Sequence, residues 1–531
     1  MLASKQHAAM SPAPLFAPTR EAAAAEVEID EVISGLIEGF LEGEDVSTPA
    51  DPAALARRFL ASEVPAGSLR PERYLEVLRE GVMPYADRIA SPRCLAHMNQ
   101  GLPWFMRPLA RLVAAMNQNL TKADASRALT LCERQALAMM HRLVFGCRDD
   151  FYDRHAGDCE STLGLVTSGG TLANLTALWC ARNAALGPCG DFRGIECEGL
   201  LAALRFYGRR EAVIIGPESM HYSFAKAAGL LGLGEQGLVR VPLEGRGRID
   251  VRALRATVAA CQARGAHILA LVGVAGSTDA GAIDPLAELA DVAREAKVHF
   301  HVDAAWGGPL LFSAKHRGRL AGIERADSVT IDGHKQMYLP LGIGLLLLRD
   351  PHAARAIEKQ AHYLSRPGSA DLGRRSLEGS RPGTSLFLHA GLHVFGRKGY
   401  AALVEESLRK ASRLVDRIKD QPDFELLAEP ESNIVLYRCV PAAWRDRLLG
   451  GDLTPADHQA LNRFNERLHK AQRRAGRTSV SRTTLFHTRH GRGVPVVALR
   501  AVIANPMTTE ADLAAVLQDQ QALAQRLASG D

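Results

Sequence analysis

A lysine near the middle of the chain has the setting of a reactive amine. Lys335 closes the run Asp332-Gly333-His334-Lys335, directly after the apolar residues 328–331. A lysine that is desolvated at the end of a strand, close to other cations, can form a Schiff base with a carbonyl compound. Taken alone, Lys335 is more simply an exposed loop lysine, so its interpretation depends on the residues around it.

A carboxylate upstream supplies the second part of a possible site. Asp303 follows the apolar run 298–302 and precedes Ala304 and Ala305. Burying an unpaired charge costs several kcal/mol, so a buried Asp303 needs a partner. A protonated pyridine nitrogen is such a partner, and the pairing keeps the ring an electron sink. An Asp that caps the next segment is the alternative, but together with Lys335 the pattern indicates pyridoxal 5′-phosphate (PLP).

A glycine-rich turn could hold the phosphate of this cofactor. Gly169, Gly170 and Thr171 lie between the apolar run 163–167 and a helical segment. Glycines let backbone N–H groups face an anion, a helix N-terminus adds a favourable partial charge, and Thr171 supplies a hydroxyl. A simple capped turn is the alternative if the motif is taken alone.

A histidine follows the next predicted strand. His221 stands after the run 212–215 and could stack on a cofactor ring or contact a substrate carboxylate. Two other patterns are rejected. Residues 232–237 match GxGxxG but precede a strand instead of following one. His487 and His490 lack a carboxylate and metalloprotease spacing, so no metal site is expected.

The elements that position these residues are visible as alternating apolar runs and helical stretches between about 160 and 350. This alternation predicts a mostly parallel sheet with helices on its faces. Ligands of such sheets bind at the carboxyl ends of the strands, where the glycine turn, Asp303 and Lys335 all fall. The predicted strands are 163–167, 212–215, 267–274, 298–302, 328–331 and 343–348, and the predicted helices are 171–186, 221–231 and 285–297.

The length of the chain predicts two or three domains. We expect an N-terminal helical arm over 1–110, a large PLP-binding domain over 111–370 and a small α+β domain over 371–531. In the last of these we expect helices at 386–419 and 510–527 and strands at 433–438 and 494–503.

The composition of the chain limits the kinds of binding partner and the cellular compartment that we expect. The 531 residues carry a net charge of +5 with both signs interspersed, and only 5% are aromatic, which argues against a nucleic-acid interface. Nine scattered cysteines without a CxxC pair predict neither disulfides nor a cysteine zinc site. Neither a signal peptide nor an apolar run of about 18 residues occurs, so we expect a cytoplasmic protein without a membrane partner.

The ordered motifs resemble the group II PLP-dependent decarboxylases, the family of glutamate, aromatic amino acid and cysteine sulfinate decarboxylases. The resemblance covers about 90–510 and implies PLP-dependent fold type I, similar to aspartate aminotransferase. This α/β fold has a mostly parallel seven-stranded sheet in its large domain and a small C-terminal α+β domain. The motifs are TSGGTLANL (167–175), HYS (221–223), GSTDAGAIDP (276–285), HVDAAWGG (301–308), DGHK (332–335) and LRAVIANPMTT (499–509).

The same resemblance implies a role for each site residue. Lys335, His221 and Asp303 form the implied catalytic set: Lys335 binds PLP covalently, Asp303 pairs with its pyridine nitrogen, and His221 stacks on the ring opposite Ala305. Gly379 and Ser380 would reach the phosphate of a neighbouring subunit, which implies a homodimer with shared active sites. The other implied cofactor contacts are Gly169, Gly170, Thr171, Thr278 and His334.

The implied substrate is a small acidic amino acid. The segments 116–120 and 377–383 are closest in style to decarboxylases that convert L-aspartate to β-alanine and CO₂. Glutamate and cysteine sulfinate are the alternative substrates. A second substrate carboxylate needs a cationic partner, for which the candidates are His97, Arg381 and, by looser analogy, Arg500.

Two other functional classes stay open. The run 379–383 also resembles PLP lyases of the sphingosine-phosphate lyase type, which cleave carbon–carbon bonds. A non-enzymatic PLP-binding protein is the third possibility, because many family members carry a protonating Tyr on the loop that corresponds to 365–374. That loop contains no Tyr here, and Tyr363 precedes it.

Overall fold

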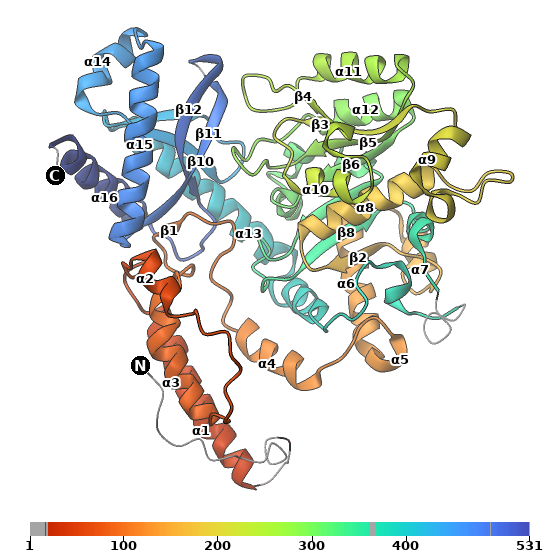
Figure 1. The fold of residues 1–531 in the computed structure, drawn as a ribbon, viewed down its shortest axis with the longest axis horizontal. Helices are drawn as coiled ribbons and strands as arrows, with labels where there is room; N and C mark the ends of the chain where they lie inside the picture. The colour runs from red at the N-terminus through yellow and green to blue at the C-terminus, as the bar shows by residue number, and fades with distance from the viewer. Residues whose placement is uncertain (1–15, 17–19, 361–367, 489, 530–531) are drawn as a thin grey trace.

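Two β-sheets organise the chain, as the computed structural model shows (Figure 1). The structure describes residues 16, 20–360, 368–488 and 490–529. Among these residues, no helix combines the length and apolar character needed to cross a membrane.

The larger sheet confirms the predicted seven-stranded, mostly parallel architecture. Its strand order is β2-β8-β7-β6-β5-β3-β4, and only β8 runs antiparallel to its neighbours. The inner strands β5, β7 and β8 are almost wholly buried, and β5 and β8 are apolar, as expected for a sheet that helices cover on each side. The strands are β2 (Gly164–Thr167), β3 (Glu211–Pro217), β4 (Leu238–Val241), β5 (Ala266–Val274), β6 (His299–Asp303), β7 (Ser328–Asp332) and β8 (Gly344–Leu348).

Helices cover this sheet, and those predicted at 171–186, 221–231 and 285–297 are present. The first of them, α8, crosses the sheet and packs on β5, β6, β7 and β8, so its N-terminus reaches the carboxyl ends of the strands. The helices associated with this sheet are α6 (Ala128–Phe145), α7 (Asp149–His155), α8 (Gly170–Ala185), α9 (Ile195–Phe206), α10 (Ser223–Leu230), α11 (Val251–Ala263) and α12 (Leu286–Ala296).

The smaller sheet has five strands in the order β1-β11-β12-β10-β9. Its edge strand β1 comes from the N-terminal region and pairs in parallel with β11. The predicted strands at 433–438 and 494–503 correspond to β10 and β12. The elements are β1 (Cys94–Leu95), β9 (Phe424–Ala428), β10 (Ile434–Cys439), β11 (Ser479–Thr488), β12 (Gly491–Val502), α14 (Ala442–Gly450), α15 (Pro455–Ala475) and α16 (Glu510–Ser529).

A long helix connects the two sheets, and an N-terminal arm extends from them. Helix α13 (Ser385–Lys419) packs against α6 at one end and β9 and β10 at the other, with a break at Gly396 (φ 58°). Helices α1 and α3 lie side by side and project away from both sheets (Figure 1). Domain limits at 110 and 370 stay a prediction. The remaining helices are α1 (Arg20–Leu41), α2 (Pro52–Arg57), α3 (Pro71–Gly81), α4 (Met106–Met116) and α5 (Ala123–Ser126).

Candidate active site

A pocket of about 470 Å³ opens at the carboxyl edge of the large sheet. Strands β2, β6 and β7 end at this edge, so the residues that follow them converge although they are distant in the sequence. The pocket brings together most of the predicted site residues, whose individual roles stay predictions. Those in its lining are Gly169, Gly170, Thr171, His221, Thr278, Asp303, Ala305, His334 and Lys335.

Lys335 reaches the pocket from the turn after β7. Its Nζ lies 3.2 Å from Oδ2 of Asp332, which is the last residue of that strand and is buried. The other oxygen of Asp332 accepts a hydrogen bond from the backbone N–H of Gly170 (2.8 Å). Asp332 therefore joins the amine of Lys335 to the start of α8. Beside it, Nδ1 of His334 lies 3.2 Å from the carbonyl oxygen of Ile343.

Asp303 is a buried carboxylate at the end of β6. Its Oδ2 accepts a hydrogen bond from Asn174 Nδ2 (2.9 Å), and its Oδ1 accepts one from the backbone N–H of Ala305 (3.1 Å). Throughout the described parts of the chain, no Lys or Arg forms an ion pair with it. A carboxylate in this position is stabilised by a cation that enters the pocket, as a protonated pyridine nitrogen would.

His221 lines the pocket between β3 and α10. Its Nδ1 accepts a hydrogen bond from the backbone N–H of Ser223 (3.3 Å). Burial lowers the pKa of His221, and the charge of Asp303 opposes this effect without cancelling it. The imidazole is thus held neutral at physiological pH, a state that suits stacking on a flat ring.

The glycine turn is tightly packed against its neighbours. A Cβ on Gly170 would lie 2.8 Å from Oδ2 of Asp332, and a Cβ on Gly344 would lie 2.4 Å from the carbonyl carbon of Gly169. The missing side chains let α8 begin directly beside β7 and β8. Thr171, in the first turn of α8, is exposed to the pocket. A hydroxyl beside the positive end of a helix suits a phosphate.

The structure corrects the prediction for Arg381. Its guanidinium forms two hydrogen bonds with Glu133, at 2.8 and 2.6 Å, and both side chains are buried. Arg381 is absent from the lining of the pocket. Because the pair is bidentate and desolvated, a substrate carboxylate would have to displace Glu133. Arg381 is therefore a structural partner of α6 in this chain.

Three other predicted residues lie outside the pocket lining. Gly379 and Ser380 are exposed and lie against the segment 119–121. His97 is also exposed, although Met98 beside it lines the pocket. Tyr363 and the first part of the loop 365–374 fall outside the described residues.

Arg500 is also absent from the pocket lining, but its buried guanidinium is only partly satisfied. It lies buried on β12, and only its Nη1 has a hydrogen-bond partner among the described residues, Ser481 Oγ at 2.9 Å. Burial lowers the pKa of Arg500 to about 10, against the attraction of Asp279. Asp279 directly follows Thr278, which lines the pocket, so Arg500 lies near a residue next to the pocket.

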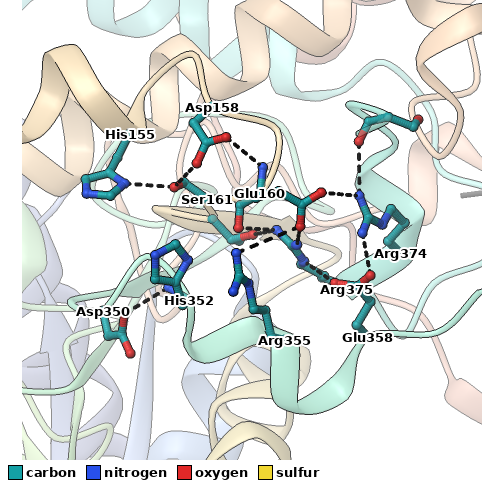
Figure 2. Close-up of polar contacts among 12 residues, drawn as sticks. His155, Asp158, Glu160, Ser161, Asp350, His352, Arg355, Glu358, Arg374 and Arg375 are labelled. Carbon is teal, nitrogen blue, oxygen red and sulfur yellow. Dashed lines mark hydrogen bonds and ion pairs between the residues drawn. The ribbon is translucent and has the colours of Figure 1, made fainter. Parts of the chain in front are cut away.

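Ion pairs join the segments on either side of residues 361–367 (Figure 2). Glu358 accepts hydrogen bonds from Arg374 and from Nε of Arg375 (2.9 Å). Glu160, in the loop before β2, pairs with the same two arginines at 3.4 and 3.1 Å. Burial opposes ionisation of Glu358, but the hydrogen bonds from the arginines outweigh it and lower its pKa.

Two buried polar residues of the pocket had no role assigned from the sequence. Asn174 and Asp332 both line the pocket and are both buried. A signal for Asn174 was present, because it falls four residues after Gly170 and so on the same helix face, which packs on the sheet. Asp332 ends an apolar strand in the same way as Asp303, and that parallel could have identified it.

Comparison with known proteins identifies the family. Residues 56–440 match the family model described as the pyridoxal-dependent decarboxylase conserved domain. The chain belongs to the pyridoxal-dependent decarboxylase family. Its cofactor is PLP, and the protein is a carboxy-lyase that acts on an amino acid.

Individual members of the decarboxylase family are similar over most of the chain. Aspartate 1-decarboxylase of Aliivibrio fischeri is 40% identical over 498 residues, which span 93% of this chain and 91% of that one. L-2,4-diaminobutyrate decarboxylase of Rhizobium meliloti is 33% identical over 365 residues, 67% of each chain. The crystal structure of mouse CSAD, 25% identical, superposes with a TM-score of 0.82 over 94% of this chain and 99% of that one. These relatives confirm the group II resemblance and the fold type I architecture.

The residues of the pocket fit PLP. The pocket supplies a lysine amine for its aldehyde and, for its pyridine nitrogen, a buried carboxylate that no Lys or Arg of the described residues pairs with. A neutral histidine suits its ring, and a glycine turn at a helix start suits its phosphate. When bound, PLP supplies an electron sink for the cleavage of a bond at Cα. The protein's own part is to orient the substrate, to exclude water and to hold protons at defined atoms.

Proposed function

We propose that this decarboxylase converts L-aspartate to β-alanine and CO₂. The observation that carries the proposal is Arg500, a buried cation whose Nε and Nη2 have no hydrogen-bond partner among the described residues. A second substrate carboxylate would satisfy both nitrogens through a bidentate, charge-assisted contact. The similarity to the aspartate 1-decarboxylase of Aliivibrio fischeri supports the same substrate.

Within this proposal the pocket residues divide the work. Lys335 would hold the cofactor covalently, and Asp332 beside it (3.2 Å) would stabilise the protonated form of the lysine amine when that amine is not bound to the cofactor. Asp303 would stabilise the protonated pyridine nitrogen. His221 and Ala305 would contact the ring, Gly169, Gly170, Thr171 and His334 would hold the phosphate, and Thr278 would lie near the ring.

We also propose a homodimer with shared active sites. Gly379 and Ser380 are exposed in the single chain and stand on a rigid base, because Arg381 beside them is bound to Glu133. The arm, α4 and the residues just before α4 expose large apolar side chains that a second copy would cover, among them Tyr74, Val77, Trp104 and Leu112. Light scattering should give twice the 57.3 kDa chain mass. A monomer that is fully active would contradict this part of the proposal.

A competition among amino acids tests the proposed substrate. CO₂ release should be measured with L-aspartate, L-glutamate, cysteine sulfinate and L-2,4-diaminobutyrate, and kcat/KM compared. Aspartate should exceed each of the others by at least about tenfold, a discrimination of about 1.4 kcal/mol. A preference for diaminobutyrate, or the release of an aldehyde from a phosphorylated amino alcohol, would overturn the proposal.

A further inference from the structure

Polar side chains form a buried row behind the cofactor pocket. His299, His301 and Asp303 alternate along β6, so all three point to the same face of the sheet. Ser328 on β7 is the register partner of His301. Asn174 of α8 covers the same face and contacts Asp303. Such a row is unusual inside a sheet whose strands β5 and β8 are almost entirely apolar.

Hydrogen bonds connect this row without a gap. His299 Nε2 lies 2.7 Å from Ser328 Oγ, and that oxygen lies 2.8 Å from Nδ1 of His301. His301 Nε2 lies 3.1 Å from Asn174 Oδ1, and Asn174 Nδ2 lies 2.9 Å from Asp303 Oδ2. Apart from His299, which is partly exposed, every member is buried.

Only one set of donors and acceptors satisfies all four contacts. The carboxylate of Asp303 accepts, so Asn174 must present its amide N–H there and its carbonyl oxygen to His301. His301 Nε2 must then carry a proton. Because burial lowers the pKa of His301 to about 3, its Nδ1 is unprotonated and accepts from Ser328. The hydroxyl of Ser328 in turn accepts from His299 Nε2–H.

Every donor in the row therefore points toward Asp303. We propose that Ser328 and His301 are positioning residues that lock the amide of Asn174 with its N–H toward Asp303, and so fix the carboxylate for the pyridine nitrogen. The inference rests on the proposed role of Asp303. A hydroxyl that donates to Nδ1 fixes the histidine tautomer, and the tautomer fixes the orientation of the amide. Aligned hydrogen bonds also strengthen one another in a buried setting.

Removal of the hydroxyl breaks the row without touching either Asp303 or Asn174. In Ser328→Ala, His301 is free to move its proton to Nδ1, and the oxygen of Asn174 then loses its donor. The amide keeps only Ser223 Oγ (3.1 Å) and Asp303 as partners and is held less firmly. PLP should then bind between about 2- and 10-fold more weakly, the effect of one hydrogen bond. Asn174→Leu, which removes the donor itself, should weaken PLP binding by at least as much, whereas Ser328→Thr keeps a hydroxyl and should restore the parent affinity.

The matched control is Thr176→Val. Like Ser328→Ala it removes a buried hydroxyl, but this one lies on α8. Its Oγ1 donates to the carbonyl oxygen of Leu172, outside the row. PLP labelled with nitrogen-15 in the ring should be added to each variant, and the ring nitrogen signal recorded by NMR together with the PLP dissociation constant. In Ser328→Ala and Asn174→Leu the signal should move toward that of an unprotonated pyridine. Thr176→Val and Ser328→Thr should match the parent.

Two results would overturn the proposal at different points. If Asp303→Asn shifts the ring nitrogen signal but Ser328→Ala and Asn174→Leu do not, Asp303 keeps its role and the row is only structural. If Asp303→Asn also leaves the signal unchanged, Asp303 is not the partner of the ring. Should Ser328→Ala fail to fold, the comparison of Asn174→Leu with Ser328→Thr decides. None of these readouts depends on which amino acid is decarboxylated.

Discussion

At the residue scale, Asp303 carries the strongest constraint on the chemistry of the pocket. Its carboxylate receives two hydrogen bonds and has no Lys or Arg partner in the described chain. Asp303→Asn keeps the shape of the side chain but cannot hold a pyridinium. We expect PLP to stay bound and kcat to fall about a thousandfold, which corresponds to about 4 kcal/mol of barrier. Cofactor absorbance and CO₂ release measured on the same sample test this, and near-native turnover would rule out the role.

Replacing Arg381 or Arg500 by Met should have opposite effects on stability and on KM. Arg381→Met would leave Glu133 buried without a partner, so the protein should lose about 3–5 kcal/mol of stability. Arg500→Met removes a cation that has little compensation, so stability should hardly change while KM for aspartate rises about tenfold or more. Thermal melts and kinetics on both variants separate the two. A rise in KM with Arg381→Met alone would reverse the assignment.

Sequence alone could identify most pocket residues, but it could not identify the ionic partner of Arg381. Lys335, Asp303 and the glycine turn each follow an apolar run, and the parallel sheet brings strand ends together. Arg381 and Glu133 are 248 residues apart, and nothing local to either shows that they pair. The ionic partner of a residue depends on tertiary packing, which local patterns do not encode.

At the scale of elements, the strands of the large sheet were predictable because each is a short apolar run between turns. Helix α15 and strand β11 were not, because both carry many polar residues and their buried sides are narrow. In α15 even the buried stripe is partly polar: it comprises His458, Leu461, Phe464, Asn465, Leu468 and Gln472.

The junction of α8 with β7 gives a prediction at this scale. Gly170→Ala would place a Cβ 2.8 Å from Oδ2 of Asp332, the oxygen that pairs with Lys335. Overpacking of this size costs about 1–3 kcal/mol. We expect PLP affinity to fall about tenfold, measured by titration of the apoenzyme. Gly157→Ala, where nothing lies within 4 Å of the new Cβ, is the control and should bind PLP normally.

At the scale of the whole molecule, buried neutral histidines should make the fold sensitive to acid. Burial lowers the pKa of His141 to about 4 from its usual 6.5, while Tyr152 and the carbonyl of Leu348 occupy its ring nitrogens. The unfolded chain binds a proton that the folded chain does not, so stability is complete above pH 6.5 and falls as the pH drops toward 4. This group alone accounts for about 3 kcal/mol.

A comparison of variants isolates that contribution. His141→Gln cannot titrate, so its melting temperature should depend less on pH between 6.5 and 5 than that of the parent. His352→Gln, at an exposed position, should leave the pH dependence unchanged. Equal slopes for His141→Gln and the parent would show that acid acts through other groups.

The central claim is that this decarboxylase removes the α-carboxylate of aspartate. The most direct test is to supply L-aspartate labelled with carbon-13 either in the α-carboxylate or in the side-chain carboxylate, and to follow CO₂ and the amino-acid product. The α-label should appear wholly in CO₂, and the side-chain label should stay in β-alanine. Release of the side-chain label with formation of alanine, or no CO₂ from either sample, would contradict the account.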